Sequence, residues 1–270
     1  MNPKIKSILK HVLLFIITFV TSTLAGAEWQ FSRFLFSSNP VTWEYFLKGM
    51  AFSIPLLGFL TVHEFGHYFT ARWHKVKVSL PYYIPLWFGF IGLPTIGTAG
   101  AVIRIKDFVD SRQKYFDIGI AGPLAGFVIA LAILFYGFTH LPPQEYIFEI
   151  HPEYEEYGLD YADYVYEDNP MAFQVGTTLL FDFFKEYVAT QPERIPNPHE
   201  MIHYPWLFAG FLALFFTALN LIPIGQLDGG HVLYGLLGNR LHRKISPTLF
   251  IVFIFYAGIG TYNPYEPTND

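Results

Sequence analysis

The 270-residue sequence contains no cysteine and few charged residues, since only 14% are Asp, Glu, Lys or Arg. The absence of cysteine excludes disulfides and thiolate metal sites, so any metal must be held by His, Asp or Glu. Scarce charge beside 52% hydrophobic and 19% aromatic residues is typical of a membrane protein. No clear small-residue cleavage site follows the basic N-terminus, which predicts a retained anchor, with a removed signal peptide as the alternative.

Long apolar runs indicate where the chain crosses the membrane, since a span needs about 20 mainly apolar residues. The runs that qualify are residues 11–27, 49–71, 118–140, 203–226 and 245–263. A sixth run, residues 79–103, is broken by proline and glycine and is predicted to be a re-entrant segment inside the protein. We therefore predict an all-α polytopic membrane protein with about five transmembrane helices.

The charges between these runs predict the orientation of the chain. If residues 79–103 do not cross, the basic groups within residues 4–10, 72–114 and 240–244 share one side, which the positive-inside rule assigns to the cytoplasm. The loop of residues 141–202 then lies outside, with thirteen acidic residues. We expect an integral multi-pass protein of a prokaryotic cell (inner) membrane, in contact with the lipid bilayer, with a cytoplasmic N-terminus. Nothing in the sequence predicts a nucleic-acid partner.

The stretch TVHEFGHYFTA, residues 61–71, places ionisable side chains inside an apolar run. His63 and His67 are four residues apart, so a helix presents both on one face to the same metal ion, with Glu64 beside them. Zinc hydrolases use this HExxH pattern, in which the glutamate takes a proton from a water activated by the metal. A chance match is the alternative, but an unused charge inside a span costs roughly 2.5–3.5 kcal/mol.

A third metal ligand is expected, and Asp228 in NLIPIGQLDGG is the candidate. By itself Asp228 could simply be an acid at a helix end before a Gly-Gly turn. However, His63 and His67 lie about 6–12 Å from the inner end of their helix at 1.5 Å per residue. The run of residues 203–226 also leads inward and brings Asp228 to the same depth. The sequence thus predicts one zinc ion per chain.

HEFGH together with NLIPIGQLDGG resembles the site-2 protease family of intramembrane zinc metalloproteases. The resemblance covers most of residues 49–240 and implies a three-helix catalytic core with a re-entrant, glycine-rich β-hairpin. The residues to which it assigns roles are the zinc ligands His63, His67 and Asp228 and the catalytic acid/base Glu64.

The resemblance also concerns substrate binding. Asn220 and Pro223 match family positions thought to orient the substrate, although an asparagine in a membrane helix often bonds a neighbouring helix instead. GTAGAVIRI, residues 97–105, resembles the family's hairpin. A strand edge beside Gly97 and Gly100 could bind an unwound substrate by β-addition, whereas a hairpin that only fills space is the alternative.

Two further features are interpreted without a catalytic role. GIAGPLAG, residues 119–126, carries Gly126 where many family members have asparagine, and its small residues predict close helix packing. His231 could lie beside the metal or at the membrane interface. Four histidines are expected on the outer side, out of reach of the zinc: His140, His151, His199 and His203.

These observations predict an intramembrane zinc endopeptidase that cuts a transmembrane segment of another protein, already trimmed on its outer side, in regulated intramembrane proteolysis. A non-proteolytic metal-binding membrane protein that sequesters membrane partners is the alternative, although it has no need of Glu64. A metal transporter would instead spread ionisable residues along a path through the membrane. The sequence indicates no oligomeric state.

We predict three regions in the chain. Residues 1–48 hold the N-terminal tail, the first transmembrane helix and an outer loop. Residues 49–240 form the catalytic core, including the re-entrant segment and the acidic outer loop. Residues 241–270 hold the last transmembrane helix and a tail.

Overall fold

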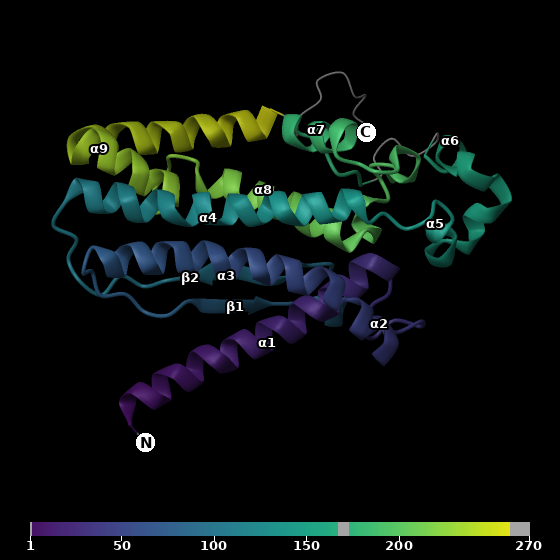
Figure 1. The fold of residues 1–270 in the computed structure, drawn as a ribbon, viewed down its shortest axis with the longest axis horizontal. Coiled ribbons are helices and arrows are strands. Elements are labelled where there is room, and N and C mark those ends of the chain that lie inside the picture. Colours follow the sequence, from purple (N-terminus) through teal and green to yellow (C-terminus); the bar gives the residue numbers. More distant parts are fainter. Residues whose placement is uncertain (1, 167–172, 260–270) are drawn as a thin grey trace, which may run out of the picture.

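The computed structural model describes residues 2–166 and 173–259, and the structural statements below concern these residues. Long helices lie side by side, with a small sheet beside them and short helices gathered at one end (Figure 1). The long helices are α1 (Pro3–Phe31), α3 (Met50–Trp73), α4 (Arg112–Thr139), α8 (Pro205–Asn220) and α9 (Asp228–Ile259). The shorter helices are α2 (Trp43–Lys48), α5 (Tyr146–Ile150), α6 (Tyr161–Val165) and α7 (Leu179–Tyr187), with 3₁₀ turns η1 (Gly89–Ile91), η2 (Pro152–Asp160), η3 (Pro192–Arg194) and η4 (Met201–His203).

Three helical segments are long and apolar enough to cross a membrane: Lys4–Phe31, Trp43–Trp73 and Arg112–Thr139. They contain nearly all of the first three predicted runs. The fourth run forms α8, whose 16 residues extend only about 24 Å, against roughly 30 Å of hydrocarbon. The fifth run falls in α9 and ends outside the described residues. The total of five spans therefore stays a prediction.

The segment of residues 79–103 contains an antiparallel hairpin of β1 (Tyr82–Leu86) and β2 (Gly97–Val102). Tyr83 pairs with Ala101 and Leu86 with Gly97, and the register shifts between Tyr83 and Pro85. Pro85 has no N–H to give to the ladder, which is why an irregularity at this point is expected. The hairpin is present as predicted, and its placement within a membrane stays a prediction.

Helix α1 holds the hairpin through side chains on its second half. Thr21 Oγ1 donates to the carbonyl oxygen of Gly97 at 2.6 Å, and Trp29 Nε1 donates to that of Thr95 at 2.8 Å. Trp87 Nε1 donates to the two carboxylate oxygens of Glu28 at 3.1 and 3.0 Å. Glu28 is buried, so this partner offsets part of the cost of removing its carboxylate from water.

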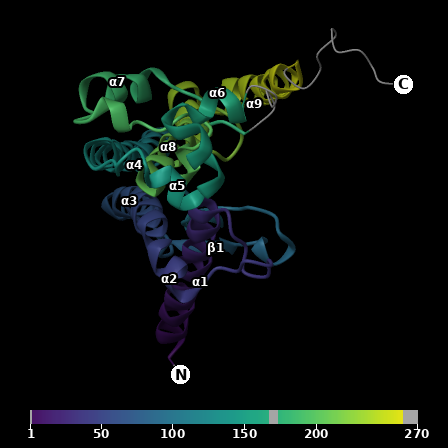
Figure 2. The ribbon, with the colours of Figure 1, turned by 90° about the vertical axis from the view of Figure 1, so that its right-hand side faces the viewer.

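Helix α4 is the centre of the bundle, because it packs against α3, α8 and α9. Figure 2 shows this group of helices end on, with α1 and the hairpin on one side of it. Small residues allow the close approach of α3 and α4: a Cβ added to Gly66 would lie 2.7 Å from the carbonyl oxygen of Ala121. The core of the bundle is aromatic and aliphatic, and its fully buried members include Phe52, Leu56, Phe59, Leu134, Phe138 and Leu207.

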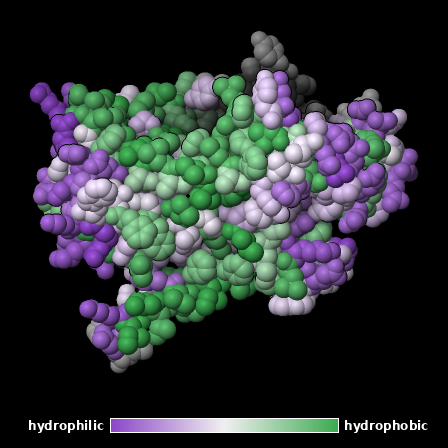
Figure 3. Space-filling view, viewed as in Figure 1, coloured by the Kyte–Doolittle hydropathy of each residue, from purple (hydrophilic) through white to green (hydrophobic). Residues whose placement is uncertain are grey.

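The outside of the bundle is apolar along its middle. A hydrophobic band crosses the visible face between two hydrophilic ends (Figure 3). Leu124, Val128 and Phe135 of α4 are all more than half exposed. An apolar belt of this extent suits contact with lipid. The short helices of the acidic loop form one of the two ends (Figure 1).

Candidate metal centre and active site

Helix α3 carries HExxH in its last three turns, and the sequence there favours a helix because it contains neither proline nor glycine pairs after Pro55. His63, Glu64 and His67 are all buried, with exposed fractions of 2%, 6% and 5%. Asp228 is the first residue of α9, where the positive end of the helix dipole favours a carboxylate. The turn after α8 brings Asp228 back to α3.

These residues present three ligand groups to one point, and we call His63, His67 and Asp228 the inner cluster. The two histidine Nε2 atoms are 3.2 Å apart. Each also lies 3.2 Å from an oxygen of Asp228, His63 from Oδ2 and His67 from Oδ1. Ligand atoms around a tetrahedral zinc ion with bonds of about 2.0–2.1 Å are about 3.3 Å apart. The inner cluster therefore fits zinc in both ligand type and spacing.

The surroundings orient His67 for this role. Its Nδ1 lies 2.6 Å from the carbonyl oxygen of Ile118 and must donate to it, which leaves the lone pair on Nε2 facing the cluster. Nδ1 of His63 is buried and has no hydrogen-bond partner among the described residues. A bound cation would give the lone pairs of both Nε2 atoms an acceptor.

A cavity of about 230 Å³ opens beside the inner cluster. Glu64 lines it, so a carboxylate that does not belong to the ligand set faces the same space as the ligands. β2 and the residues after it form another wall, through Ala101, Val102 and Ile103. The arrangement can bring an extended chain, a metal and a general base together, which is what peptide hydrolysis requires.

The four residues predicted to bind substrate do not all lie at the cavity. Asn220, the last residue of α8, lines the cavity. Pro223 lies in the turn between α8 and α9, outside the cavity lining. Gly97 packs against α1, because a Cβ added there would lie 2.3 Å from Cα of Ser22. Gly100 has φ of +98° and open space where its Cβ would be.

The sequence interpretation missed how directly the glycines of α4 touch the ligands. A Cβ on Gly122 would lie 2.1 Å from Nε2 of His67, and one on Gly126 would lie 3.0 Å from Nδ1 of His63. GIAGPLAG is therefore a packing motif, as predicted, and the side chains that it admits are the two histidines. The GxxxG spacing predicts close packing but does not say which side chains pack against the glycines. The sequence therefore did not reveal their contact with the two histidines.

His231 is the second feature on which the sequence left alternatives open. Its side chain lines the cavity, and its ring stacks on Tyr115 at 5.8 Å between centroids. Gln226 and Leu227, which precede Asp228, also line the cavity. The segment before α9 thus supplies a wall of the site as well as a ligand.

Comparison with known proteins shows which family this chain is similar to. The sequence model described as "Peptidase family M50" matches residues 51–261. Among curated proteins, "Probable zinc metalloprotease EGY2, chloroplastic" from Oryza sativa subsp. indica is 31% identical over 185 residues, which is 68% of this chain and 29% of the relative. "Probable zinc metalloprotease EGY1, chloroplastic" from Arabidopsis thaliana is 31% identical over 186 residues, with the same two shares.

A more distant relative, "Probable zinc metallopeptidase EGY3, chloroplastic" from Arabidopsis thaliana, is 25% identical over 217 residues, which is 77% of this chain and 33% of that protein. The match thus spans about a third or less of each of these relatives. No solved structure matches the chain significantly.

Proposed function

Since this chain belongs to peptidase family M50, we propose that it is an intramembrane zinc endopeptidase that hydrolyses peptide bonds in transmembrane segments of other membrane proteins. The observation that carries the proposal is one cavity lined by the inner cluster, by Glu64 and by the end of β2. The apolar helices on either side of that cavity support a site within the membrane.

The roles of the residues follow from their positions. Bound by His63, His67 and Asp228, one zinc ion would supply Lewis acidity for the scissile carbonyl and a water with a pKa of about 7. Glu64 accepts the proton of the attacking water and returns it to the leaving amine. The carbonyl of Ile118 keeps His67 in the tautomer that the site needs.

The substrate is proposed to bind as an added strand. β2 pairs with β1 along one edge, and its other edge has no strand partner within the described residues. The positive φ angles of Gly97 and Gly100, +79° and +98°, favour glycine at both positions and set the path of this strand. Asn220 and Pro223, at the end of α8 and in the turn after it, are proposed to orient the unwound segment.

We further propose a multi-pass protein of a prokaryotic cell (inner) membrane, with the N-terminus in the cytoplasm, the site near the cytoplasmic face and the acidic loop outside. The plant relatives carry the word chloroplastic in their names, and localising the chain in its own cells tests the proposed membrane. The proposed substrate is a transmembrane protein trimmed beforehand on its outer side. The division of the chain at residues 48 and 240 is also part of the proposal.

Purified wild type and Glu64→Gln would test the function, each with zinc content and cleavage of a model transmembrane substrate measured. We expect equal zinc contents and a loss of about 10²- to 10⁴-fold in kcat/KM for Glu64→Gln. Glu44→Gln is a matched control, because Glu44 is exposed on α2 and, among the described residues, pairs only with Lys48. Equal zinc without cleavage of any helix in a panel would favour the sequestering protein instead.

A further inference from the structure

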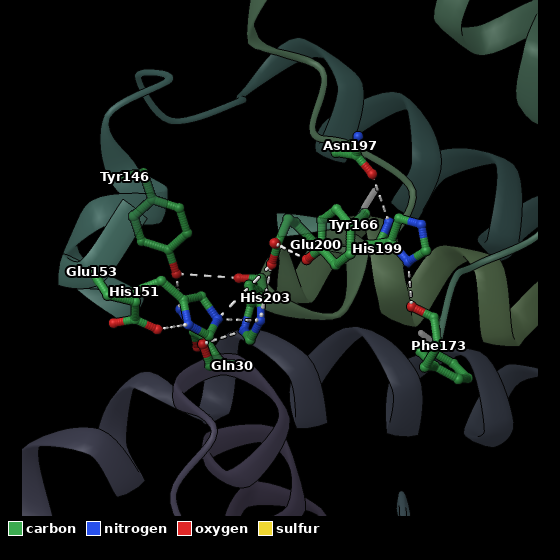
Figure 4. A network of polar contacts seen from close by, with 10 residues as sticks. All are labelled: Gln30, Tyr146, His151, Glu153, Tyr166, Phe173, Asn197, His199, Glu200 and His203. Carbon is green, nitrogen blue, oxygen red and sulfur yellow. Dashed lines mark hydrogen bonds and ion pairs between the residues drawn. The ribbon is translucent and has the colours of Figure 1, made fainter. Parts of the chain in front are cut away.

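A second group of metal-binding side chains lies at the other end of the bundle, and we call His151, Glu200 and His203 the outer cluster. Nε2 of His151 is 3.3 Å from Nε2 of His203. Oε2 of Glu200 lies 3.3 Å from Nε2 of His203 and 3.9 Å from Nε2 of His151. Figure 4 shows His151 meeting Glu200 and His203, which lie three residues apart on a second segment of the chain. Glu200 and His203 are almost completely buried, with exposed fractions of 1% and 2%.

The hydrogen bonds around the outer cluster fix both histidine tautomers. His203 Nδ1 lies 2.9 Å from the carbonyl oxygen of Gln30 and must donate to it. His151 Nδ1 lies 3.0 Å from a carboxylate oxygen of Glu153 and donates there. In the neutral rings both Nε2 lone pairs therefore face each other and Oε2 of Glu200. Three lone pairs directed at one point repel each other unless a cation lies between them.

Glu200 is prepared as an anionic ligand. Its other oxygen, Oε1, accepts a hydrogen bond from the hydroxyl of Tyr166. Every proposed ligand thus has a partner that orients it, which is the arrangement found behind metal ligands in proteins.

We propose that the outer cluster binds one divalent transition-metal ion of the zinc class. Two imidazoles and a carboxylate suit zinc or cobalt(II) and disfavour calcium and magnesium, which take oxygen ligands. The ion is structural, since among residues 2–166 and 173–259 no carboxylate comparable to Glu64 is free beside it: Glu153 is bound to His151, and Glu200 is itself a ligand. It ties the two ends of the acidic loop to each other and, through Gln30, to the end of α1.

The first test separates the two sites by zinc content. The full chain with His63→Ala and His67→Ala lacks the inner cluster and should still retain about one zinc per chain, against about two in wild type. Adding His151→Ala should remove that ion. His151 is partly exposed in a loop, so the fold should survive its replacement, and circular dichroism checks this. His140→Ala, an exposed outer histidine, should leave the zinc content unchanged.

The second test measures the loop itself by limited proteolysis within residues 141–203 of the chain without the inner cluster. Zinc at roughly ten times its Kd should slow cleavage about tenfold, because an ion that binds only the closed loop stabilises it in that proportion. A chelator should reverse the protection, and His151→Ala should abolish it.

The proposal is overturned if the folded chain without the inner cluster retains no zinc, since a proton would then bridge the outer cluster. It is equally overturned if zinc is retained but does not depend on His151. Failure of the proposed protease would give a different result. If the inner cluster bound no zinc, the outer zinc would still protect the loop of residues 141–203 from proteolysis.

Discussion

The inner and outer clusters each join two histidines and one carboxylate, with inner distances of 3.2 Å and outer distances of 3.3–3.9 Å. In each, one histidine donates Nδ1–H to a backbone carbonyl, that of Ile118 or that of Gln30. They lie beyond opposite ends of α8, whose length is about 24 Å. The ligand atoms alone therefore do not distinguish a catalytic site from a structural one.

The surroundings supply the difference. The inner cluster leaves Nδ1 of His63 without a described partner but faces a cavity that also holds Glu64 and a strand. The outer cluster has a partner behind every ligand and, in the part of the chain that the structure describes, no spare carboxylate beside it. We infer that the inner cluster can process a substrate, whereas the outer one can only hold the chain in place.

The largest expected effect comes from exchanging the carboxylate of each cluster for an amide. Asp228→Asn should abolish cleavage and reduce zinc by about one ion per chain, because three protein ligands are the usual minimum for catalytic zinc. Glu200→Gln should also reduce zinc by about one ion but keep kcat/KM within about threefold, since its ion takes no part in chemistry. Zinc analysis beside a cleavage assay measures both. Loss of cleavage in folded Glu200→Gln would contradict the separation of roles.

A second expected effect concerns the glycine that admits His67. Gly122→Ala puts a methyl group 2.1 Å from Nε2 of His67, so the ring must move and zinc should be lost from the inner cluster. Overpacking of this kind costs about 1–3 kcal/mol of stability. Gly58→Ala on α3 is the matched control, because nothing lies within 4 Å of its added Cβ. Zinc content and thermal unfolding distinguish the two, and normal zinc in Gly122→Ala would show that the helices separate easily.

Glu153→Gln should have a smaller effect, confined to the outer cluster. Removing the carboxylate behind a histidine ligand weakens metal binding by about 10- to 100-fold. The inner cluster and cleavage should not change. The neighbouring exposed Glu155→Gln serves as control, and competition with a chelator of known affinity gives the two Kd values. Equal affinities would mean that Glu153 does not support His151.

The smallest expected effect lies in the contact between α1 and the hairpin. Thr21→Val removes the donor to the carbonyl of Gly97 and should cost about 0.5–1.5 kcal/mol of stability. It should raise KM more than it lowers kcat, since β2 is the proposed substrate edge. Thr248→Val is the control, because the described hydrogen bond of its hydroxyl goes to the carbonyl oxygen of Lys244 in the same helix. If neither the unfolding temperature nor KM changed, the contact of α1 with the hairpin would have no role in substrate binding.

The sequence predicted those helices and interruptions that depend only on neighbouring residues. The apolar runs of residues 11–27, 49–71 and 118–140 are helices long enough to cross a membrane, because hydrophobic length is a property of consecutive residues. The apolar run of residues 203–226 is longer than the helix that it forms. Helix α8 ends at Asn220, and the rest of the run belongs to the turn that leads to α9. Proline and glycine in residues 79–103 likewise predicted the interruption that became a hairpin.

By itself, the sequence determined HExxH, because residues four apart on a helix share a face whatever surrounds them. It also indicated Asp228, through a count of depth along two helices. Only the tertiary structure decided that Gly122 touches His67, and that His151 meets Glu200 and His203 across the acidic loop. The reason is physical: a helix repeats its geometry at every turn, whereas contacts between distant segments depend on the path of the whole chain, which no local period encodes.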